Sequence, residues 1–277
     1  TAEKAELGRF LFYDTRLSVN SQMSCGSCHN QALAFTDGKA KAVGTTGEVH
    51  PRSTMSLANV AYNSRLTWAN PLIDKLAPQA LGPLFSDNPV EMGLTDAIKQ
   101  SVLESLEADS TYQRLFTDAF PDESNPYTFT HITQAIASFQ RSLISSDSPF
   151  DRYMLGEIDA LSNSAKNGLQ LFFSERLECF HCHGGFTFTD SADHDGKPLA
   201  EISFHNTGLY NIDGEGSYPV PNTGIHEITG NPEDMGRFRA PTLRNIALTG
   251  PYMHDGSIAT LNEVIAHYAA GGRTIAD

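Results

Sequence analysis

All four cysteines of this 277-residue chain lie in two copies of one pentapeptide, Cys-x-x-Cys-His. Two thiols at this spacing can add across the two vinyl groups of one haem, and the histidine that follows can then ligate the haem iron. The pentapeptide therefore predicts two covalently bound c-type haems. The predicted attachment residues are Cys25, Cys28, Cys179 and Cys182, and the predicted proximal iron ligands are His29 and His183.

Other uses of the cysteines explain less of the pattern. Two disulfides within the Cys-x-x-Cys pairs would leave both adjacent histidines unexplained. Zinc would require further cysteines or histidines at ligand spacing, and a thioredoxin-like redox site would require one motif in a βαβ setting. Because the complete motif occurs twice and no cysteine is left over, we favour two haems.

An internal repeat leads into the two haem motifs. Segments 8–17 and 168–177 share the pattern Gly-x-x-Leu-Phe-aromatic-x-x-Arg-Leu, and Phe-Thr-Asp follows each haem motif, at 35–37 and 188–190. Apolar residues recur at helical spacing in both segments, which predicts an amphipathic helix that covers one face of each porphyrin. The repeat indicates two related units, each folded around a haem.

The predicted fold class is mainly α, with two cytochrome-c-like domains, because strand signals are weak throughout. The Ser-rich segment 144–149 places a boundary near its end, which gives domains 1–150 and 151–277. Residues 193–230 are rich in Gly, Pro and Asn, and we expect them to form an ordered loop on the second haem. Further predicted helices cover 96–106, 132–143 and 261–270, the last of them ended by Gly271 and Gly272.

The composition excludes several classes of partner. The hydrophobic fraction of 40% is typical of a globular chain, and the formal charge is -14. A surface of this sign repels nucleic acid and anionic membranes, and no run of about 18 apolar residues could span a bilayer. Residues 1–9 predict a polar helix start and not a signal peptide. Because covalent haem attachment is linked to export, we expect the mature form of a periplasmic protein.

Four more segments have a familiar arrangement, at 59–68, 79–93, 241–245 and 248–256. Together with the haem motifs, they resemble the bacterial dihaem cytochrome c peroxidase and MauG superfamily over nearly the whole chain. Within it, the chain is most similar to MauG homologues of the methanobactin-operon type (MbnH), on residues 56–62 and 67–71. The peroxidases usually have Phe-Trp-Asp-Gly where this chain has the second of these segments, residues 67–71.

The resemblance implies unlike ligands for the two irons. Tyr268 stands fourteen residues after His254, where the peroxidases carry a methionine and MauG carries a tyrosine. It is therefore the implied ligand of the second iron opposite His183. Phenolate favours ferric and higher states, whereas a thioether favours ferrous iron. His267 and Met253 are the alternative ligands.

For the first haem, the resemblance implies His29 as proximal ligand and an open distal side. Glu91 and Pro83 match the distal carboxylate and proline of the family. A carboxylate there can take a proton from hydrogen peroxide and return it to the leaving oxygen, and burial would raise its pKa into a useful range. His50 lies in the loop where the peroxidases carry a removable distal histidine. It is either a further iron ligand or, as we favour, a surface imidazole.

Other residues match family positions around and between the haems. Trp68, the single tryptophan, would be a core residue on composition alone, but it matches the residue set between the haems, where an indole lets two irons share oxidising equivalents. Arg244 is expected to contact the cofactor. A calcium ion is implied between the haems, held by oxygens of Thr249 and Pro251 and, where relatives have asparagine, by Ser53.

These expectations converge on a peroxide-dependent dihaem oxidase. By resemblance, peroxide yields a high-valent state of the bis-Fe(IV) type, which draws electrons from a tryptophan of a partner protein and converts it to kynurenine. A copper-binding protein of the MbnP type is the implied partner. MauG uses a second tryptophan as a relay, which this chain lacks. The alternatives are a cytochrome c peroxidase that takes electrons from a small cytochrome, and a dihaem electron carrier without catalysis.

Overall fold

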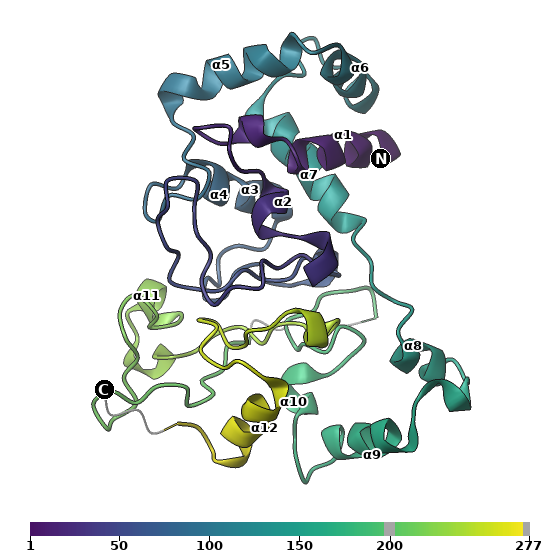
Figure 1. Cartoon of the computed structure of the whole chain (residues 1–277), viewed down its shortest axis with the longest axis vertical. Helices are drawn as coiled ribbons and strands as arrows, with labels where there is room; N and C mark the ends of the chain where they lie inside the picture. Colours follow the sequence, from purple (N-terminus) through teal and green to yellow (C-terminus); the bar gives the residue numbers. More distant parts are fainter. Residues whose placement is uncertain (197–202, 274–277) are drawn as a thin grey trace.

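The computed structural model describes residues 1–196 and 203–273. These residues form helices joined by long loops, and they contain isolated β-bridges but no strand. Two units lie one above the other, the N-terminal helices in the upper unit and the C-terminal helices in the lower one (Figure 1). The predicted mainly α fold with two units is confirmed. None of the described helices is long and apolar enough to cross a membrane.

Four helices of 10 to 13 residues build the N-terminal unit. The first begins after Thr1, whose Oγ1 accepts a hydrogen bond of 3.3 Å from the Lys4 N–H. Its side chains Leu7, Leu11 and Phe12 are fully buried, so the helix predicted before the first haem motif is present and packs on its apolar face. The four helices are α1 (Ala2–Phe12), α5 (Asp96–Glu107), α6 (Ser110–Ala119) and α7 (Phe129–Arg141).

The C-terminal unit has shorter helices and a smaller core. Helix α9 covers the start of the second repeat, as predicted, but none of its residues is buried, and Leu171 and Phe173 are each 41% exposed. The core consists of loop residues such as Phe204, Leu209 and Tyr218. An apolar helix face of this kind suits a unit whose interior is completed by a flat apolar group. The helices are α8 (Pro149–Met154), α9 (Asn163–Phe172), α10 (Phe180–His183), α11 (His226–Thr229) and α12 (Leu261–Ala269).

The helices predicted at 96–106, 132–143 and 261–270 are confirmed with small shifts at their ends. After α12, Gly271 and Gly272 both have positive φ, as a helix stop requires. Of the loop predicted at 193–230, residues 197–202 lie outside the described residues. The short helical turns are α2 (Cys25–Cys28), α3 (Leu76–Gln79), α4 (Leu81–Phe85), η1 (Thr15–Leu17), η2 (Gln31–Leu33), η3 (Val60–Tyr62), η4 (Ile158–Ala160), η5 (Pro232–Asp234) and η6 (Ile246–Leu248).

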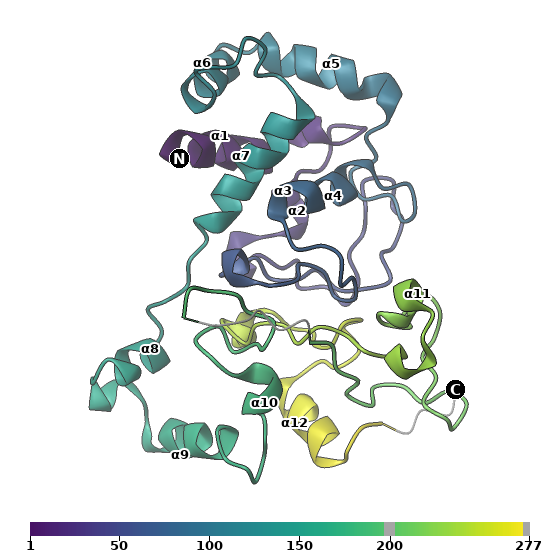
Figure 2. The same ribbon diagram turned by 180° about the vertical axis from the view of Figure 1, so that it is seen from behind.

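The two units touch at more places than the linker between α7 and α8, which Figure 2 shows from behind. The backbone N–H of Arg239 donates to the carbonyl oxygen of Trp68 at 2.8 Å. The Arg52 guanidinium pairs with the Glu227 carboxylate at 2.6 Å. The segment around Trp68 thus contacts both units. The domain boundary near residue 150 stays a prediction.

Two glycines that open the two repeats have opposite surroundings. A Cβ on Gly8 would lie 1.9 Å from the carbonyl oxygen of Ala135 in α7, so only glycine lets α1 and α7 approach this closely. A Cβ on Gly168 would meet nothing within 4 Å.

Replacing each of these glycines by alanine tests the packing. Gly8→Ala should lower the free energy of unfolding by about 1–3 kcal/mol, because α1 must move away from α7. Gly168→Ala should raise it by up to about 1 kcal/mol, because alanine favours the helix. Urea unfolding of the two holoprotein variants measures both changes. Equal midpoints would contradict the close contact of α1 with α7.

Candidate active site

The same hydrogen bond occurs in both units, between the proximal histidine and a phenylalanine that follows it. His29 Nδ1 lies 2.8 Å from the carbonyl oxygen of Phe35, and His183 Nδ1 lies 3.1 Å from that of Phe188. Both phenylalanines have positive φ. Because a carbonyl can only accept, Nδ1 carries the proton and Nε2 keeps its lone pair for a metal. In both units the contact is made by the first residue of the Phe-Thr-Asp segment that follows the haem motif.

The donor groups are suited to a c-type haem. Burial lowers the pKa of His29 and of His183, which keeps both imidazoles neutral, as iron ligands must be. Burial also raises the pKa of the Cys25 thiol to about 12 and that of the Cys28 thiol to about 11. Neither thiol is in a disulfide, so both can form thioether bonds with a haem. The residues present fit a c-type haem.

The first haem motif borders a cavity of about 700 Å³, a volume typical of cofactor sites. Helices α2, α3, α4 and α7 all contribute to its walls, which include the apolar side chains of Phe12, Leu57 and Leu84. Most of the residues predicted for the first site line this cavity. Those that line it are Cys25, Cys28, His29, His50, Ser53, Trp68, Pro83 and Glu91.

Glu91 reaches this cavity from a loop after α4 that is fixed at several points. Its carbonyl oxygen accepts a hydrogen bond of 2.7 Å from the Thr45 N–H, and the N–H of Met92 donates to the Pro83 carbonyl oxygen at 2.9 Å. Burial raises the pKa of the Glu91 carboxyl group. The His50 imidazole lies beside it, with Nε2 3.9 Å from Oε1. The raised pKa makes this carboxyl group better able to take up a proton and give it back than an exposed one.

Trp68 lies where the two units meet. It lines the first cavity, and it also packs against the core of the C-terminal unit. Its Nε1–H donates to the Ser53 carbonyl oxygen at 2.9 Å, and the Ser53 hydroxyl donates to the Met253 carbonyl oxygen at 3.2 Å. Ser53 is thus in contact with the segment that carries Thr249 and Pro251, but the calcium role of these three residues stays a prediction.

The second haem motif borders a more open cavity of about 1130 Å³. Cys182 and Tyr268 both line it, so α12 brings the predicted tyrosine to the motif. The two alternative ligands are placed differently and are not among the residues that line the cavity. His267 is buried with Nε2 2.8 Å from the Thr207 carbonyl oxygen, and Met253 packs against the core of the C-terminal unit. Tyr268 is 49% exposed, which places the second site close to solvent.

Arg244 is bound mainly to protein groups. Its guanidinium pairs with both carboxylate oxygens of Asp151, with Nη2 2.7 Å from Oδ1, and its Nε donates to the Phe186 carbonyl oxygen at 2.7 Å. This guanidinium holds the pKa of Asp151 well below its usual range. Three of the five N–H groups are used in this way. The predicted contact of Arg244 with the cofactor stays a prediction.

Two polar residues at or near the first cavity were not predicted from the sequence as functional residues. Gln79 lines the cavity about one helical turn before Pro83, and it lay within a segment that carried the resemblance. Arg239 is buried, and its Nε donates to the Thr67 carbonyl oxygen at 3.1 Å, but its Nη1 has no hydrogen-bond partner among the described residues. A buried unpaired guanidinium N–H suits an anionic partner such as a haem propionate. No sequence signal marked Arg239.

A charged pair borders the second cavity. His205 lines the cavity, and its Nε2 lies 2.5 Å from Oδ2 of Asp190. The hydrogen bond to this carboxylate, with a smaller contribution from Cys182, raises the pKa of His205 to about 10, so the imidazole is a cation at neutral pH. Asp190 ends the second Phe-Thr-Asp segment, whereas nothing in the sequence pointed to its partner.

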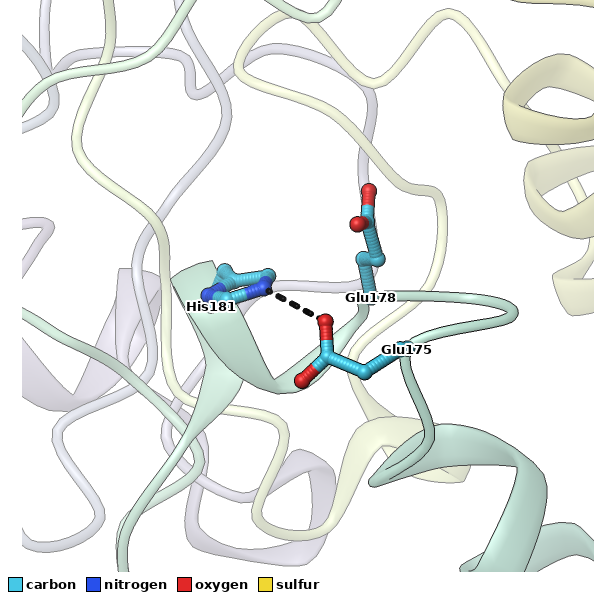
Figure 3. A group of neighbouring side chains, drawn as sticks. All are labelled: Glu175, Glu178 and His181. Atoms are coloured by element: carbon cyan, nitrogen blue, oxygen red, sulfur yellow. Dashed lines mark ion pairs between the residues drawn. The ribbon is translucent and has the colours of Figure 1, made fainter.

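Glu175, Glu178 and His181 gather beside the second haem motif (Figure 3). His181 Nε2 lies 3.9 Å from Glu175 Oε2. All three side chains are exposed, so water competes with them for any cation. The group therefore adds a solvated, mainly acidic patch to this end of the molecule.

Comparison with known proteins identifies the family. The family model for the di-haem cytochrome c peroxidases matches residues 2–159. The methylamine utilization protein MauG of Methylorubrum extorquens is 36% identical over 274 residues, which are 98% of this chain and 70% of that protein. The chain belongs to the di-haem cytochrome c peroxidase family. It is thus an oxidoreductase of the peroxidase and MauG class with two haem c groups, as the sequence predicted.

Further proteins of known sequence or structure are also similar to this chain. The cytochrome c551 peroxidase of Pseudomonas aeruginosa is 32% identical over 264 residues, which are 95% of this chain and 71% of that protein. The crystal structure of a MauG-like protein associated with microbial copper homeostasis is 51% identical, with a TM-score of 0.97 over 100% of this chain and 79% of that one. The diheme peroxidase BthA of Burkholderia thailandensis, at 22% identity and a TM-score of 0.74 over 97% of this chain and 71% of that one, shares the fold.

The reaction of the diferric holoprotein with peroxide should depend on the ionisation of Glu91. As a base toward peroxide, Glu91 would act in its carboxylate form, and burial raises its pKa above the ordinary 4.5. The rate constant should therefore fall as the pH is lowered through this raised pKa. Glu91→Gln should lower the rate constant about 10²- to 10⁴-fold and remove this dependence. Stopped-flow spectroscopy measures both effects, and a wild-type rate in the variant would refute the role of Glu91.

Proposed function

We propose that this chain is a MauG-like oxidase that uses hydrogen peroxide to convert a tryptophan of a partner protein to kynurenine. The observation that carries the proposal is Tyr268, which shares the second cavity with Cys182. A phenolate ligand stabilises oxidised iron, so this site would hold oxidising equivalents instead of accepting electrons from a cytochrome. The 51% identical MauG-like structure, associated with copper homeostasis, supports this choice over the cytochrome c peroxidase alternative.

The residues of the first cavity would prepare the peroxide. Haem held there by Cys25, Cys28 and His29 would supply the iron and the electrons for cleavage of the O–O bond. Glu91 takes a proton from the oxygen that binds and returns it to the oxygen that leaves. Pro83 and Glu91 both line this cavity.

Trp68 and Tyr268 would give the oxidising equivalents a path to the surface. The Trp68 indole is fixed by Ser53 between the first cavity and the C-terminal unit, where it can lose an electron transiently and recover it. The half-exposed Tyr268 brings the second site close to a docked protein. Since there is no second tryptophan, the last transfer is direct or passes through Tyr or Phe side chains.

The conversion balances with two molecules of peroxide for each tryptophan. Four electrons and four protons leave the substrate side chain, and its pyrrole ring opens to N-formylkynurenine with two oxygen atoms taken from water. The electrons and protons reduce the two molecules of peroxide to four molecules of water, so that two form in net terms. Hydrolysis then releases formate and leaves kynurenine. We also infer a periplasmic location, because attachment of haem to Cys-x-x-Cys-His is linked to export, and a copper-binding partner of the MbnP type.

Replacement of the second-site tyrosine tests the proposal. Tyr268→Met should lower oxidation of a tryptophan in a copper-binding partner at least tenfold and should raise peroxide turnover with a reduced small cytochrome, because a thioether favours ferrous iron. Mass spectrometry of the partner reads the loss of one carbon and the gain of one oxygen. Tyr153→Met, in α8, is the matched control and should change neither activity. Full tryptophan oxidation by Tyr268→Met would overturn the proposal.

A calcium ion between the haems is part of the same proposal. Its ligands would be carbonyl oxygens of Thr249 and Pro251 and the Ser53 hydroxyl, all uncharged, and calcium affinity falls with fewer charged ligands. We therefore expect dialysis against EGTA to remove the ion, and Ser53→Asn to retain it better, as measured by metal analysis. Calcium that resists EGTA in the wild type, or an unchanged content in the variant, would contradict this assignment.

A further inference from the structure

Residues 42–52 form a narrow loop that is folded back on itself beside the first cavity. An isolated β-bridge pairs Val43 with Val49, and the N–H of His50 donates to the Ala42 carbonyl oxygen at 2.8 Å. The tip of the loop holds the backbone of Glu91 through the 2.7 Å hydrogen bond from the Thr45 N–H. One loop therefore supplies His50 and holds the backbone of Glu91.

The other end of this loop is fixed to the C-terminal unit. Arg52 pairs with Glu227 at 2.6 Å, and its Nε donates to Oδ1 of Asn222 at 3.1 Å. The guanidinium also lies over the ring of Phe238, 5.6 Å from its centroid. These contacts set the position of the backbone that carries His50 relative to both units.

The hydrogen bonds of His50 select one tautomer. Its Nδ1 accepts a hydrogen bond of 3.1 Å from the backbone N–H of Arg52, so the ring proton is on Nε2. That Nε2–H group lies 3.9 Å from Oε1 of Glu91. In this tautomer Nε2 has no lone pair for iron, whereas it can donate to a carboxylate.

The surroundings keep this imidazole neutral. Burial lowers the pKa of His50, with the Arg52 charge acting in the same direction and that of Glu227 against it. Glu48 lines the same cavity, and its carboxylate accepts from the Val90 N–H at 2.9 Å. Hydrogen bonds in catalytic groups are often long before substrate binds and tighten in the complex. A distance of 3.9 Å can close by a small rotation of either side chain.

We propose that His50 is a positioning residue for Glu91: its neutral Nε2–H donates to the carboxylate and directs it at the peroxide site. The inference rests on the peroxide step of the proposed function and is independent of the tryptophan step. No bond is made or broken by His50, which keeps its proton throughout. The first haem therefore keeps an open distal side with no ligation by His50.

Two substitutions separate the effect of the hydrogen bond that the His50 ring donates from the effect of the size of the ring. His50→Leu removes the donor, and His50→Gln supplies a neutral amide N–H at a similar reach. With diferric holoprotein and hydrogen peroxide alone, we expect His50→Leu to lower the second-order rate constant at least tenfold and His50→Gln to stay within about threefold of wild type. The apparent pKa of the rate should rise in His50→Leu, since the carboxylate loses a stabilising donor, and should be restored in His50→Gln.

A matched control is available in the same unit. His131 Nε2 also lies 3.9 Å from a glutamate, Glu123, but away from the cavity, so His131→Gln should leave the rate and its pH profile unchanged. EPR of the ferric first haem supplies a second readout. Equal rates and pH profiles in wild type and His50→Leu would overturn the proposal. A second result would also overturn it: a first haem that is six-coordinate in wild type but five-coordinate and faster to react in His50→Leu or His50→Gln. That result would show that His50 is an iron ligand.

Discussion

The hydrogen bond between each proximal imidazole and a phenylalanine carbonyl is the constraint on which both sites depend. In each unit it puts the proton on Nδ1 and leaves Nε2 free, so that His29 and His183 are prepared as ligands by the backbone itself. The positive φ of Phe35 and Phe188 goes with this contact. Such backbone conformations are costly for a bulky side chain, and they persist here twice, at the same place in the repeat.

The two sites share this hydrogen bond and differ in the residues that surround it and in their exposure to solvent. The first is closed in by α1, α7 and the loop that holds Glu91, so its carboxyl group has a raised pKa. The second is more open, with Tyr268 half exposed and the apolar face of α9 left for the cofactor. A closed site with an acid and base suits reaction with a small oxidant, and an open one suits exchange with a large partner. Trp68 contacts both regions.

Much of this arrangement could be predicted from local sequence. The haem motifs, the helices and the Phe-Thr-Asp repeat are short-range patterns, and they determined the fold class and the proximal ligands. Arg239 and the partner of Asp190 could not be found in this way, because their contacts join residues far apart in the chain. The sequence marked His50, but not the tautomer set by the Arg52 N–H or the position of its Nε2 beside Glu91. For Arg244, the ion pair with Asp151 shows a structural use that its family position did not indicate.

The central claim is that one peroxide-reactive site and one site that stores oxidising equivalents act together in a single chain. Titration of the diferric holoprotein with stoichiometric peroxide, followed by EPR and optical spectroscopy, tests it most directly. We predict that one equivalent removes both ferric signals and yields a long-lived state two electrons above diferric, without prior reduction. A requirement for reduction of one haem before any reaction, or loss of only one ferric signal, would contradict the claim.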